Sequence, residues 1–301
     1  MKYPIRASKS SDKKYVSHST SGSRRFGAML KNAGYDQFVI TGRSDKPCYL
    51  LISDEGVETC DAGDLWGKDI HETTDILAKR HEGRTGKAGV WTIGPAGENL
   101  VKIAQATLDN FNSLGRNVGA VLGSKNLKAV VTIGSKGIKV HDQKRFLKIY
   151  KDKLKTILDH PHYQPRPKLH HEMLQQFFDR TATNLKACVG CIGPCRSTHE
   201  AKDGNFMGAT YQGGNFTMAL DFGRRLRIED YSAMFKLIDI TNRYGLCVLT
   251  TIRMMYFVTR MYEKGVISAE DTGGLVLKLG DFDAYLALIE KILHRQSVVC
   301  S

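Results

Sequence analysis

The sequence lacks a long apolar segment. No apolar run in its 301 residues reaches the roughly 20 residues that a membrane-spanning helix requires, so we predict no membrane partner. The N-terminal stretch "MKYPIRASKSSDKKYVSHSTSGSRR" is basic and rich in serine, but it lacks the apolar core of a secretory signal. These absences predict a cytoplasmic protein.

The sequence also lacks any recognisable nucleic-acid-binding motif, although it is basic. Its 44 lysine and arginine residues exceed its 31 acidic residues, which gives a net charge of +13. The basic residues are spread along the chain instead of forming one patch, so we predict no nucleic-acid partner. A charge of this sign also attracts an anionic cofactor or an acidic partner protein.

The cysteine content does not suit a disulfide framework, because seven is an odd number. Three of the seven, Cys188, Cys191 and Cys195, lie within "CVGCIGPC" and have the spacing C-x2-C-x3-C. Thiolates at such a spacing hold an iron–sulfur cluster or zinc, and both need four ligands. We favour the cluster. Zinc with His199 as the fourth ligand, and three unrelated thiols, are the alternatives.

Two glycine-rich stretches match neither the P-loop nor the G-x-G-x-x-G dinucleotide pattern. In "GRNVGAVLGSKNLKA" (115–129), glycine N–H groups and the fork of Arg116 suit an anion, with Lys125 and Lys128 following. A plain tight turn explains the same glycines equally well. In "GPAGEN" (94–99), we expect Glu98 to cap backbone N–H groups of a turn rather than to act in catalysis.

The hydrophobic pattern predicts an α+β fold in two regions, a β-rich region over residues 1–137 and an all-α region over residues 138–301. A connector rich in proline and histidine, His160–His171, is the best boundary signal. The predicted strands are Phe38–Thr41, Tyr49–Ser53, Val57–Cys60, Val90–Ile93 and Ala129–Ile133, with a helix over 69–81. The predicted later helices are a basic amphipathic helix Gln143–Leu158, Ile228–Tyr244 ended by Gly245, a helix from a Thr250 or Thr251 cap to Gly265, and Ala284–Arg295.

Six sequence motifs together indicate a family. In chain order they are "AGYDQFVITGRSDKPCYLLI", "LWGKDIHETTDIL", "IGPAGENLV", "GAVLGSKNLKAVV", "CVGCIGPC" and "YEKGVISAEDTGGL". In order and spacing they resemble the aldehyde:ferredoxin oxidoreductase family, from about Phe26 to about His294. Members of this family contain a tungsten or molybdenum bis-pterin and one [4Fe–4S] cluster. The resemblance implies that residues 1–137 are the pterin-binding domain without its first strands. It also implies that residues 138–301 are a truncated helical domain that carries the cysteine motif.

The resemblance assigns candidate site residues by position. Cys188, Cys191 and Cys195 match three of the family's four cluster ligands, and the fourth cysteine has no match here. Gly115 and Arg116 match part of a segment that contacts the pterin and its phosphates. A family arginine that precedes this pair is replaced, because residues 112–113 read Asn-Ser instead of Arg-Ala.

A second pterin motif of the family, D-x-x-G-L-D, corresponds to "NRYGLC". Gly245 and Leu246 are kept, whereas Asn242 and Cys247 replace the two acids. The stretch "FMGATYQGGNF" lacks the carboxylates that many members carry there, which resembles the branch found in benzoyl-CoA reductase complexes, or a degenerate copy. No catalytic residue is assigned.

The resemblance implies oxidation of a small aldehyde to a carboxylic acid, with electrons passing through the cluster to ferredoxin. Because only half of the usual cofactor clamp is matched, we expect a second polypeptide to complete the site. A non-catalytic or degenerate iron–sulfur subunit of such an enzyme is the alternative. The retained glycine motifs favour the enzyme, and the missing carboxylates favour the alternative.

Overall fold

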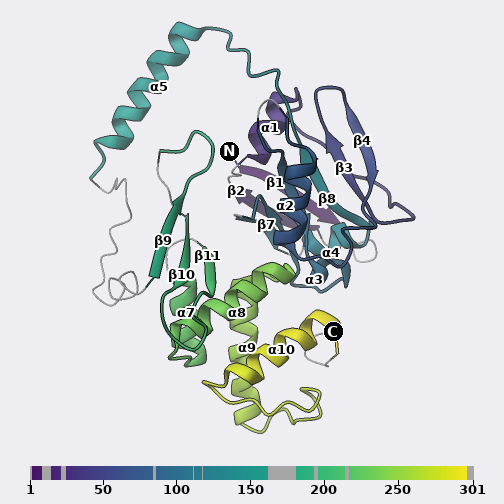
Figure 1. Cartoon of the computed structure of the whole chain (residues 1–301), viewed down its shortest axis with the longest axis vertical. Helices are drawn as coiled ribbons and strands as arrows, with labels where there is room; N and C mark the ends of the chain where they lie inside the picture. The colour runs from purple at the N-terminus through teal and green to yellow at the C-terminus, as the bar shows by residue number, and fades with distance from the viewer. Residues whose placement is uncertain are drawn as a thin grey trace.

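The computed structural model describes residues 2–8, 15–21, 25–83, 86–110, 112–116, 118–161, 181–192, 196–213 and 217–296. Figure 1 shows a sheet-rich part built by the first half of the chain and a mostly helical part built by the second half. Helix α5 (Gln143–Leu158) stands away from both. Among the described helices, none combines the length and the apolarity needed to cross a bilayer.

A six-stranded mixed sheet forms the centre of the first part. Its strand order is β4-β3-β8-β5-β6-β7, in which β3 and β8 are parallel and all other neighbours are antiparallel. Every residue of β5 and β8 is buried, as expected for strands in the middle of a sheet that is covered on both faces. The strands are β3 (Cys48–Ile52), β4 (Val57–Asp61), β5 (Gly89–Ile93), β6 (Gln105–Leu108), β7 (Asn112–Arg116) and β8 (Leu127–Thr132). A separate antiparallel pair, β1 (Lys2–Ser8) and β2 (Tyr15–Ser21), precedes the sheet.

Helices cover both faces of the six-stranded sheet. On one face, α1 (Phe26–Asn32) and α4 (Val118–Gly123) share a core with Trp91 and Val130. On the other face, α2 (Ile70–Arg80) shares a core with Val90 and Val131. Successive residues of a strand point to opposite faces, so β5 and β8 supply side chains to both cores.

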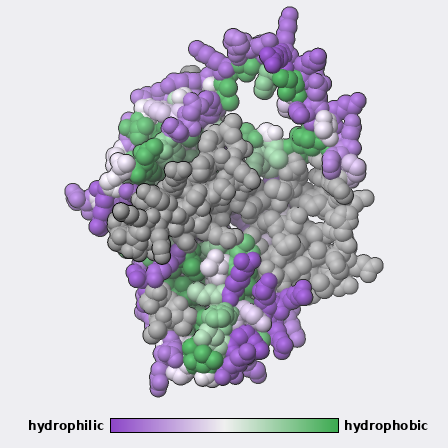
Figure 2. All heavy atoms as spheres, turned by 180° about the vertical axis from the view of Figure 1, so that it is seen from behind, coloured by the Kyte–Doolittle hydropathy of each residue, from purple (hydrophilic) through white to green (hydrophobic). Residues whose placement is uncertain are grey.

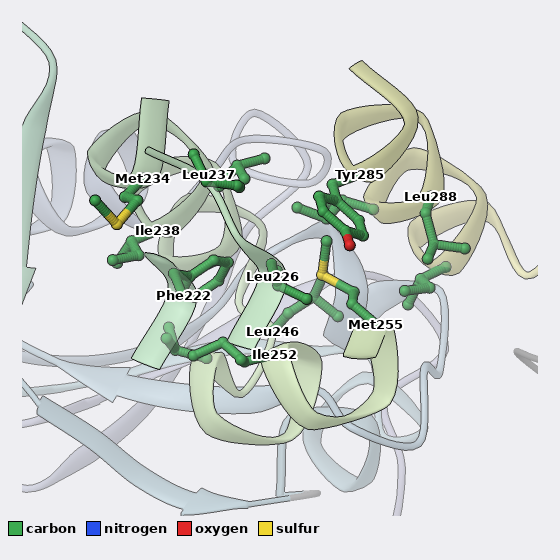
Figure 3. Packing of buried hydrophobic residues seen from close by; sticks show 14 of the residues in the cluster. Phe222, Leu226, Met234, Leu237, Ile238, Leu246, Ile252, Met255, Tyr285 and Leu288 are labelled. Carbon is green, nitrogen blue, oxygen red and sulfur yellow. The ribbon is translucent and has the colours of Figure 1, made fainter. Parts of the chain in front are cut away.

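In its described residues, the second part contains an antiparallel three-stranded sheet and four helices besides α5. The sheet has the order β11-β10-β9, with β9 (Thr181–Lys186), β10 (Arg196–Ala201) and β11 (Thr210–Gly213). The helices are α7 (Thr217–Leu226), α8 (Tyr231–Tyr244), α9 (Val248–Glu263) and α10 (Phe282–His294). Figure 3 shows their side chains packed together, among them Phe222, Ile238 and Met255. The same core includes Ala96, Val101 and Ala104 of the first part, so the two parts share one packed interior.

The α+β class and most predicted elements of the first region are confirmed, but one predicted strand is wrong. Residues 38–41 form no strand. The side chain of Phe38 packs edge-on against Phe26, with ring centroids 6.2 Å apart, while Val39 is 82% exposed. Ile40 packs against the same core as Phe38, so the side chains alternate as in a strand although the backbone forms no strand. Strands β6 and β7 were not predicted, because β6 has only four residues, two of them polar, and β7 contains a bulge at Gly115.

In the second region, helices α5, α8 and α10 confirm their predictions, including termination of α8 by Gly245. The predicted cap at Thr250 or Thr251 is wrong, because α9 begins at Val248 after Cys247. The three-stranded sheet is a departure from an all-helical region. The connector residues 162–171 lie outside the described part of the chain.

Candidate functional site

The two glycine-rich stretches pack against each other, backbone to backbone. The short helix α3 (Pro95–Glu98) lies against α4, and a Cβ atom added to Gly123 would collide with the carbonyl oxygen of Gly97. A Cβ atom at Gly119 would lie 2.7 Å from the carbonyl oxygen of Gln105. Gly119 and Gly123 therefore allow the tight packing of α3, α4 and the start of β6. This packing accounts for the two glycines without an anion.

The Gly245–Leu246 motif is joined to the sheet at the C-terminal end of α8. Gly245 has φ +76°, a left-handed conformation that glycine adopts without steric cost. Its carbonyl oxygen accepts a hydrogen bond from the backbone N–H of Gln105 at 2.7 Å. Leu246 forms a β-bridge with Ala104, and the N–H of Cys247 donates to Ile103 at 3.0 Å. The end of α8 is thus fixed to the backbone just before β6.

The Gly115–Arg116 segment approaches the same point from the other side. In the β6–β7 pair, Arg116 lies opposite Gln105 and Leu114 lies opposite Ala106, so Gly115 is the extra residue of a bulge. The structure describes only the backbone of Gly115 and Arg116. Gln105 therefore stands between two segments that are far apart in the sequence. This convergence fits a ligand that spans both segments.

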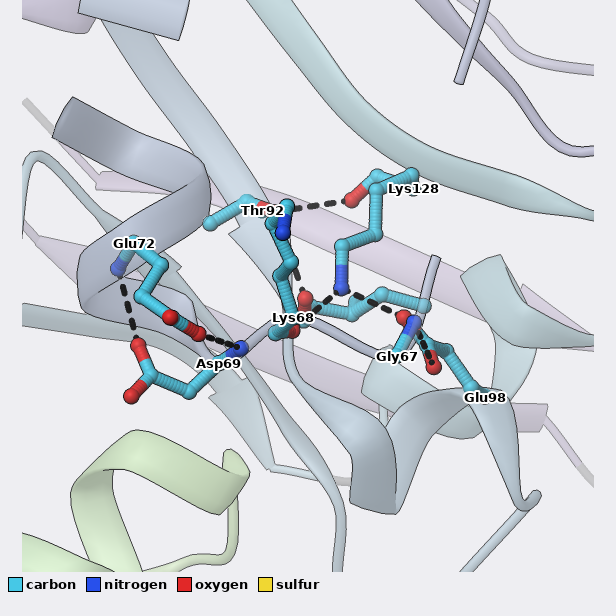
Figure 4. Close-up of polar contacts among 8 residues, drawn as sticks. Gly67, Lys68, Asp69, Glu72, Thr92, Glu98 and Lys128 are labelled. Carbon is cyan, nitrogen blue, oxygen red and sulfur yellow. Dashed lines mark hydrogen bonds and ion pairs between the residues drawn. The ribbon is translucent and has the colours of Figure 1, made fainter. Parts of the chain in front are cut away.

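A buried ion pair holds α3 in place (Figure 4). The ammonium group of Lys128 pairs with Glu98 and donates a hydrogen bond to the carbonyl oxygen of Lys68 at 2.7 Å. The second oxygen of Glu98 accepts from the N–H of Gly67 at 2.8 Å, as predicted for this carboxylate. The side chains of Lys128 and Glu98 are 0% and 5% exposed. Lys128 is therefore a buried anchor and not a surface ligand for an anion.

Burial lowers the pKa of the Lys128 ammonium group, and the charge of Glu98 opposes that shift. Removing either partner would leave the other charge buried alone. Lys125, the other lysine of this stretch, donates to the carbonyl oxygen of Gly42 at 2.7 Å. Both lysines thus bind the protein's own backbone.

Arg243, inside the "NRYGLC" motif, connects α8 to α2. Its guanidinium group pairs with Asp239 at 2.8 Å and with Asp69 at 3.0 Å. Asp69 also caps α2 in a capping box with Glu72. Burial and the charge of Arg243 lower the pKa of the neighbouring His71. Sequence reasoning missed this junction, although Asp69 and Glu72 three residues later are a signal for the helix start.

The cysteine motif lies in the connection between β9 and β10. The N–H of Cys191 donates to the carbonyl oxygen of Cys188 at 3.1 Å, and Gly190 has φ +71°, so residues 188–191 form a tight turn. Cys188 is half-buried and Cys191 is exposed. Two thiols on one glycine-containing turn fit the donor set of a thiolate-bound cluster. Cys195 lies outside the described residues, and the described part alone holds no group of three potential metal ligands.

His199 belongs to the core, which counts against its prediction as an alternative zinc ligand. Its side chain is 0% exposed, its Nε2 atom lies 2.5 Å from the hydroxyl oxygen of Ser197, and its ring stacks on Tyr211. Burial lowers the pKa of His199 to about 4. A neutral, stacked histidine in the core packs the sheet against α8 rather than reaching toward the cysteine turn.

Two family models match the chain in succession. Residues 5–134 match the aldehyde ferredoxin oxidoreductase N-terminal domain, and residues 144–300 match domains 2 and 3 of the same family. The glycine junction and the cysteine turn thus fall within a known oxidoreductase architecture. The chain belongs to the aldehyde ferredoxin oxidoreductase family.

Several known proteins are similar to this chain in sequence, and one solved structure is similar to it in fold. The tungsten-containing aldehyde ferredoxin oxidoreductase of Pyrococcus furiosus is 30% identical over 90% of this chain and 49% of its own length. The Pyrococcus abyssi protein of the same name is 30% identical over 94% of this chain and 51% of its own length. The solved active site complex BamBC of benzoyl coenzyme A reductase, in complex with 1,5 dienoyl-CoA, superposes with a TM-score of 0.77 at 26% identity, over 92% of this chain and 47% of that chain. This chain spans about half the length of the curated relatives it matches.

Proposed function

We propose that this chain supplies the pterin-contacting and cluster-binding half of an aldehyde-oxidising enzyme. The reaction takes an aldehyde and water to a carboxylic acid and releases two protons and two electrons, which reduce two molecules of a one-electron acceptor such as ferredoxin. When bound, a tungsten or molybdenum bis-pterin would supply oxygen transfer and two-electron chemistry, and a [4Fe–4S] cluster would pass the electrons on singly.

The chain's own residues would bind and orient these groups. Arg116 would pair with cofactor phosphate through its guanidinium fork, and Gly115 would let the bulged backbone approach closely. Gly245 and Leu246 would contact the pterin through their backbone at the end of α8, because the side chain of Leu246 is buried in the core. Cys188, Cys191 and Cys195 would provide three cluster ligands, with the fourth supplied from outside the matched sequence.

The proposal depends on one observation above all, the convergence of the two glycine segments on Gln105. Gly245 is hydrogen-bonded to Gln105 at 2.7 Å, and Arg116 is its partner across the β6–β7 ladder. Both segments carry motifs that the family resemblance assigns to the pterin, and a pterin that contacts both of them would require them to lie close together.

The proposed function implies two partners, an electron acceptor and the part of the enzyme that this chain does not match. The net charge of +13 would steer an acidic electron acceptor such as a ferredoxin toward the chain. Because the chain spans about half the length of its relatives, the complete site would need a second polypeptide, or further sequence, that carries the rest.

The test is metal content followed by turnover. The chain is purified without oxygen from cells supplied with both molybdate and tungstate, and Fe, Mo, W and Zn are measured per chain. We expect iron together with tungsten or molybdenum, and aldehyde-dependent reduction of ferredoxin once the second half is present. Arg116→Met should lower the tungsten or molybdenum content several-fold, whereas Arg43→Met, at an exposed position outside the glycine motifs, should not.

The missing carboxylates in residues 206–216 favour a second candidate, a non-catalytic iron–sulfur subunit. Iron without tungsten or molybdenum, and no aldehyde oxidation in the presence of the second half, would support that candidate. Absence of all these metals would contradict both.

A further inference from the structure

Helix α5 is the one described helix of more than ten residues that buries none of its side chains. It starts at Asp142, whose carboxylate accepts a hydrogen bond from the N–H of Arg145 at 2.9 Å, and it runs for 16 residues to Leu158. Figure 1 shows it projecting from the rest of the chain. By comparison, α8 has 14 residues and buries eight of them.

The apolar side chains of α5 form one continuous face. Phe146, Tyr150 and Ile157 follow one another at spacings of four and seven residues, which places them on the same side of a helix. They are 52%, 50% and 46% exposed. Leu147, Ile149 and Leu158 extend the face and are exposed to a similar degree. Figure 2 shows hydrophobic atoms along the inner side of this helix and hydrophilic atoms along its outer side.

An isolated helix of this length is only marginally stable in water, because most helical stability in proteins comes from packing an apolar face. Contiguous apolar surface of this kind marks an interaction site. Helix α5 is therefore an amphipathic helix, and no part of the described chain buries its apolar face.

Charge narrows the choice of partner. The helix carries six basic residues and one acidic residue, Asp152. Two copies of α5 packed face to face would bring their lysines together, so the charge disfavours a second copy of this chain. It favours a protein surface with an apolar groove bordered by acidic side chains.

We propose that the apolar face of α5 docks the polypeptide that carries the half of the family's length that this chain does not match. The relatives have about twice the matched length, and the half that this chain does not match would need a surface on this half to pack against. Among the described helices, α5 has the most exposed large apolar side chains, six against one in α9. The inference shares with the proposed function the assumption of a second polypeptide, but it needs neither cofactor nor turnover.

The test is site-specific photo-cross-linking of the full chain in the cells that make it. The photoreactive residue p-benzoylphenylalanine replaces Tyr150 on the apolar face, or Lys148 on the polar face as a control, and cross-linked peptides are identified by mass spectrometry. We expect the Tyr150 position to yield peptides of a polypeptide that matches the second half of the family. The Lys148 position should yield at least tenfold less of that product.

Four outcomes would overturn the proposal: a phospholipid adduct, which would assign α5 to a membrane surface; a cross-link to a second copy; a cross-link to residues 162–180 of the same chain; or no product. A double variant, Phe146→Ser with Ile157→Ser, gives an independent check. It should lower co-purification of the second polypeptide at least tenfold without shifting the Tm of the chain, because neither side chain is buried. Failure of these tests alongside normal metal content and turnover would leave the proposed function intact.

Discussion

Helices α8 and α5 have similar lengths and similar amphipathic patterns, yet they have opposite environments. Eight residues of α8 are buried against its neighbours, and its end carries the Gly245 motif. No residue of α5 is buried. Periodicity predicts that both are helices, but it cannot say whether the surface that covers the apolar stripe belongs to the same chain. The comparison distinguishes apolar residues that stabilise this chain, as in α8, from apolar residues that are exposed to a partner, as in α5.

The largest effect is expected from the core of α8. Phe235 is fully buried and packs against Tyr231 and Tyr211. Phe235→Ala should lower the free energy of unfolding by about 3–5 kcal/mol, because it removes the packing of a buried ring and leaves a cavity. Urea unfolding of the purified chain measures this. A loss below about 1 kcal/mol would mean that α8 is less tightly packed than the structure indicates.

Breaking the ion pair beneath α3 should cost about 3–4 kcal/mol, because Lys128→Met leaves Glu98 buried without its partner. The double variant Lys128→Met with Glu98→Leu should regain much of this loss, since no lone charge remains. Urea unfolding of the two variants and the parent chain gives the comparison. Equal losses in the single and double variants would contradict the pairing.

His199 should make stability depend on pH. Its pKa is about 4 in the folded chain and near 6.5 when unfolded, so the unfolded state binds the proton more readily. The contribution of His199 is therefore complete above pH 6.5 and declines as the pH falls from 6.5 toward 4, by about 3 kcal/mol in total. His199→Phe should flatten this decline in urea unfolding between pH 7.5 and 4.5. An unchanged slope would mean that carboxylates alone cause it.

The smallest effect is expected in α5. Phe146→Ala should change the free energy of unfolding of the isolated chain by less than about 0.5 kcal/mol, because the side chain is half exposed and no residue of α5 is buried. The same urea titration as for Phe235→Ala measures it. A loss comparable to that of Phe235→Ala would show that α5 packs within this chain and would abolish the contrast.

The sequence predicted those helices and strands whose hydrophobic pattern is contained within the element itself. Strands β3, β5 and β8 and helix α2 have clear hydrophobic patterns, and β4 follows β3 directly after a turn. Strand β6 was missed because it has four residues, two of them polar, and β7 was missed because of the bulge at Gly115. The prediction at residues 38–41 failed because Phe38 and Ile40 pack inward on either side of exposed Val39, which imitates the alternation of a strand.

The candidate site was predictable only in its parts. Resemblance selected Gly115, Arg116, Gly245 and Leu246, but nothing in the sequence indicates that they meet at Gln105, because that junction depends on how α8 docks against β6. The buried role of Lys128 was likewise hidden, since a lysine in a glycine-rich stretch reads as a surface charge until its partner Glu98 is placed.

The junction at Gln105 has a mechanical consequence. Both glycine segments contact the backbone of Gln105. Gly245 accepts a hydrogen bond from its N–H, and Arg116 lies opposite it in the β6–β7 pair. A displacement of the Gln105 backbone would therefore disturb both segments together. Under the proposed function, a cofactor held between the segments would be affected at both of them by a change at this one residue.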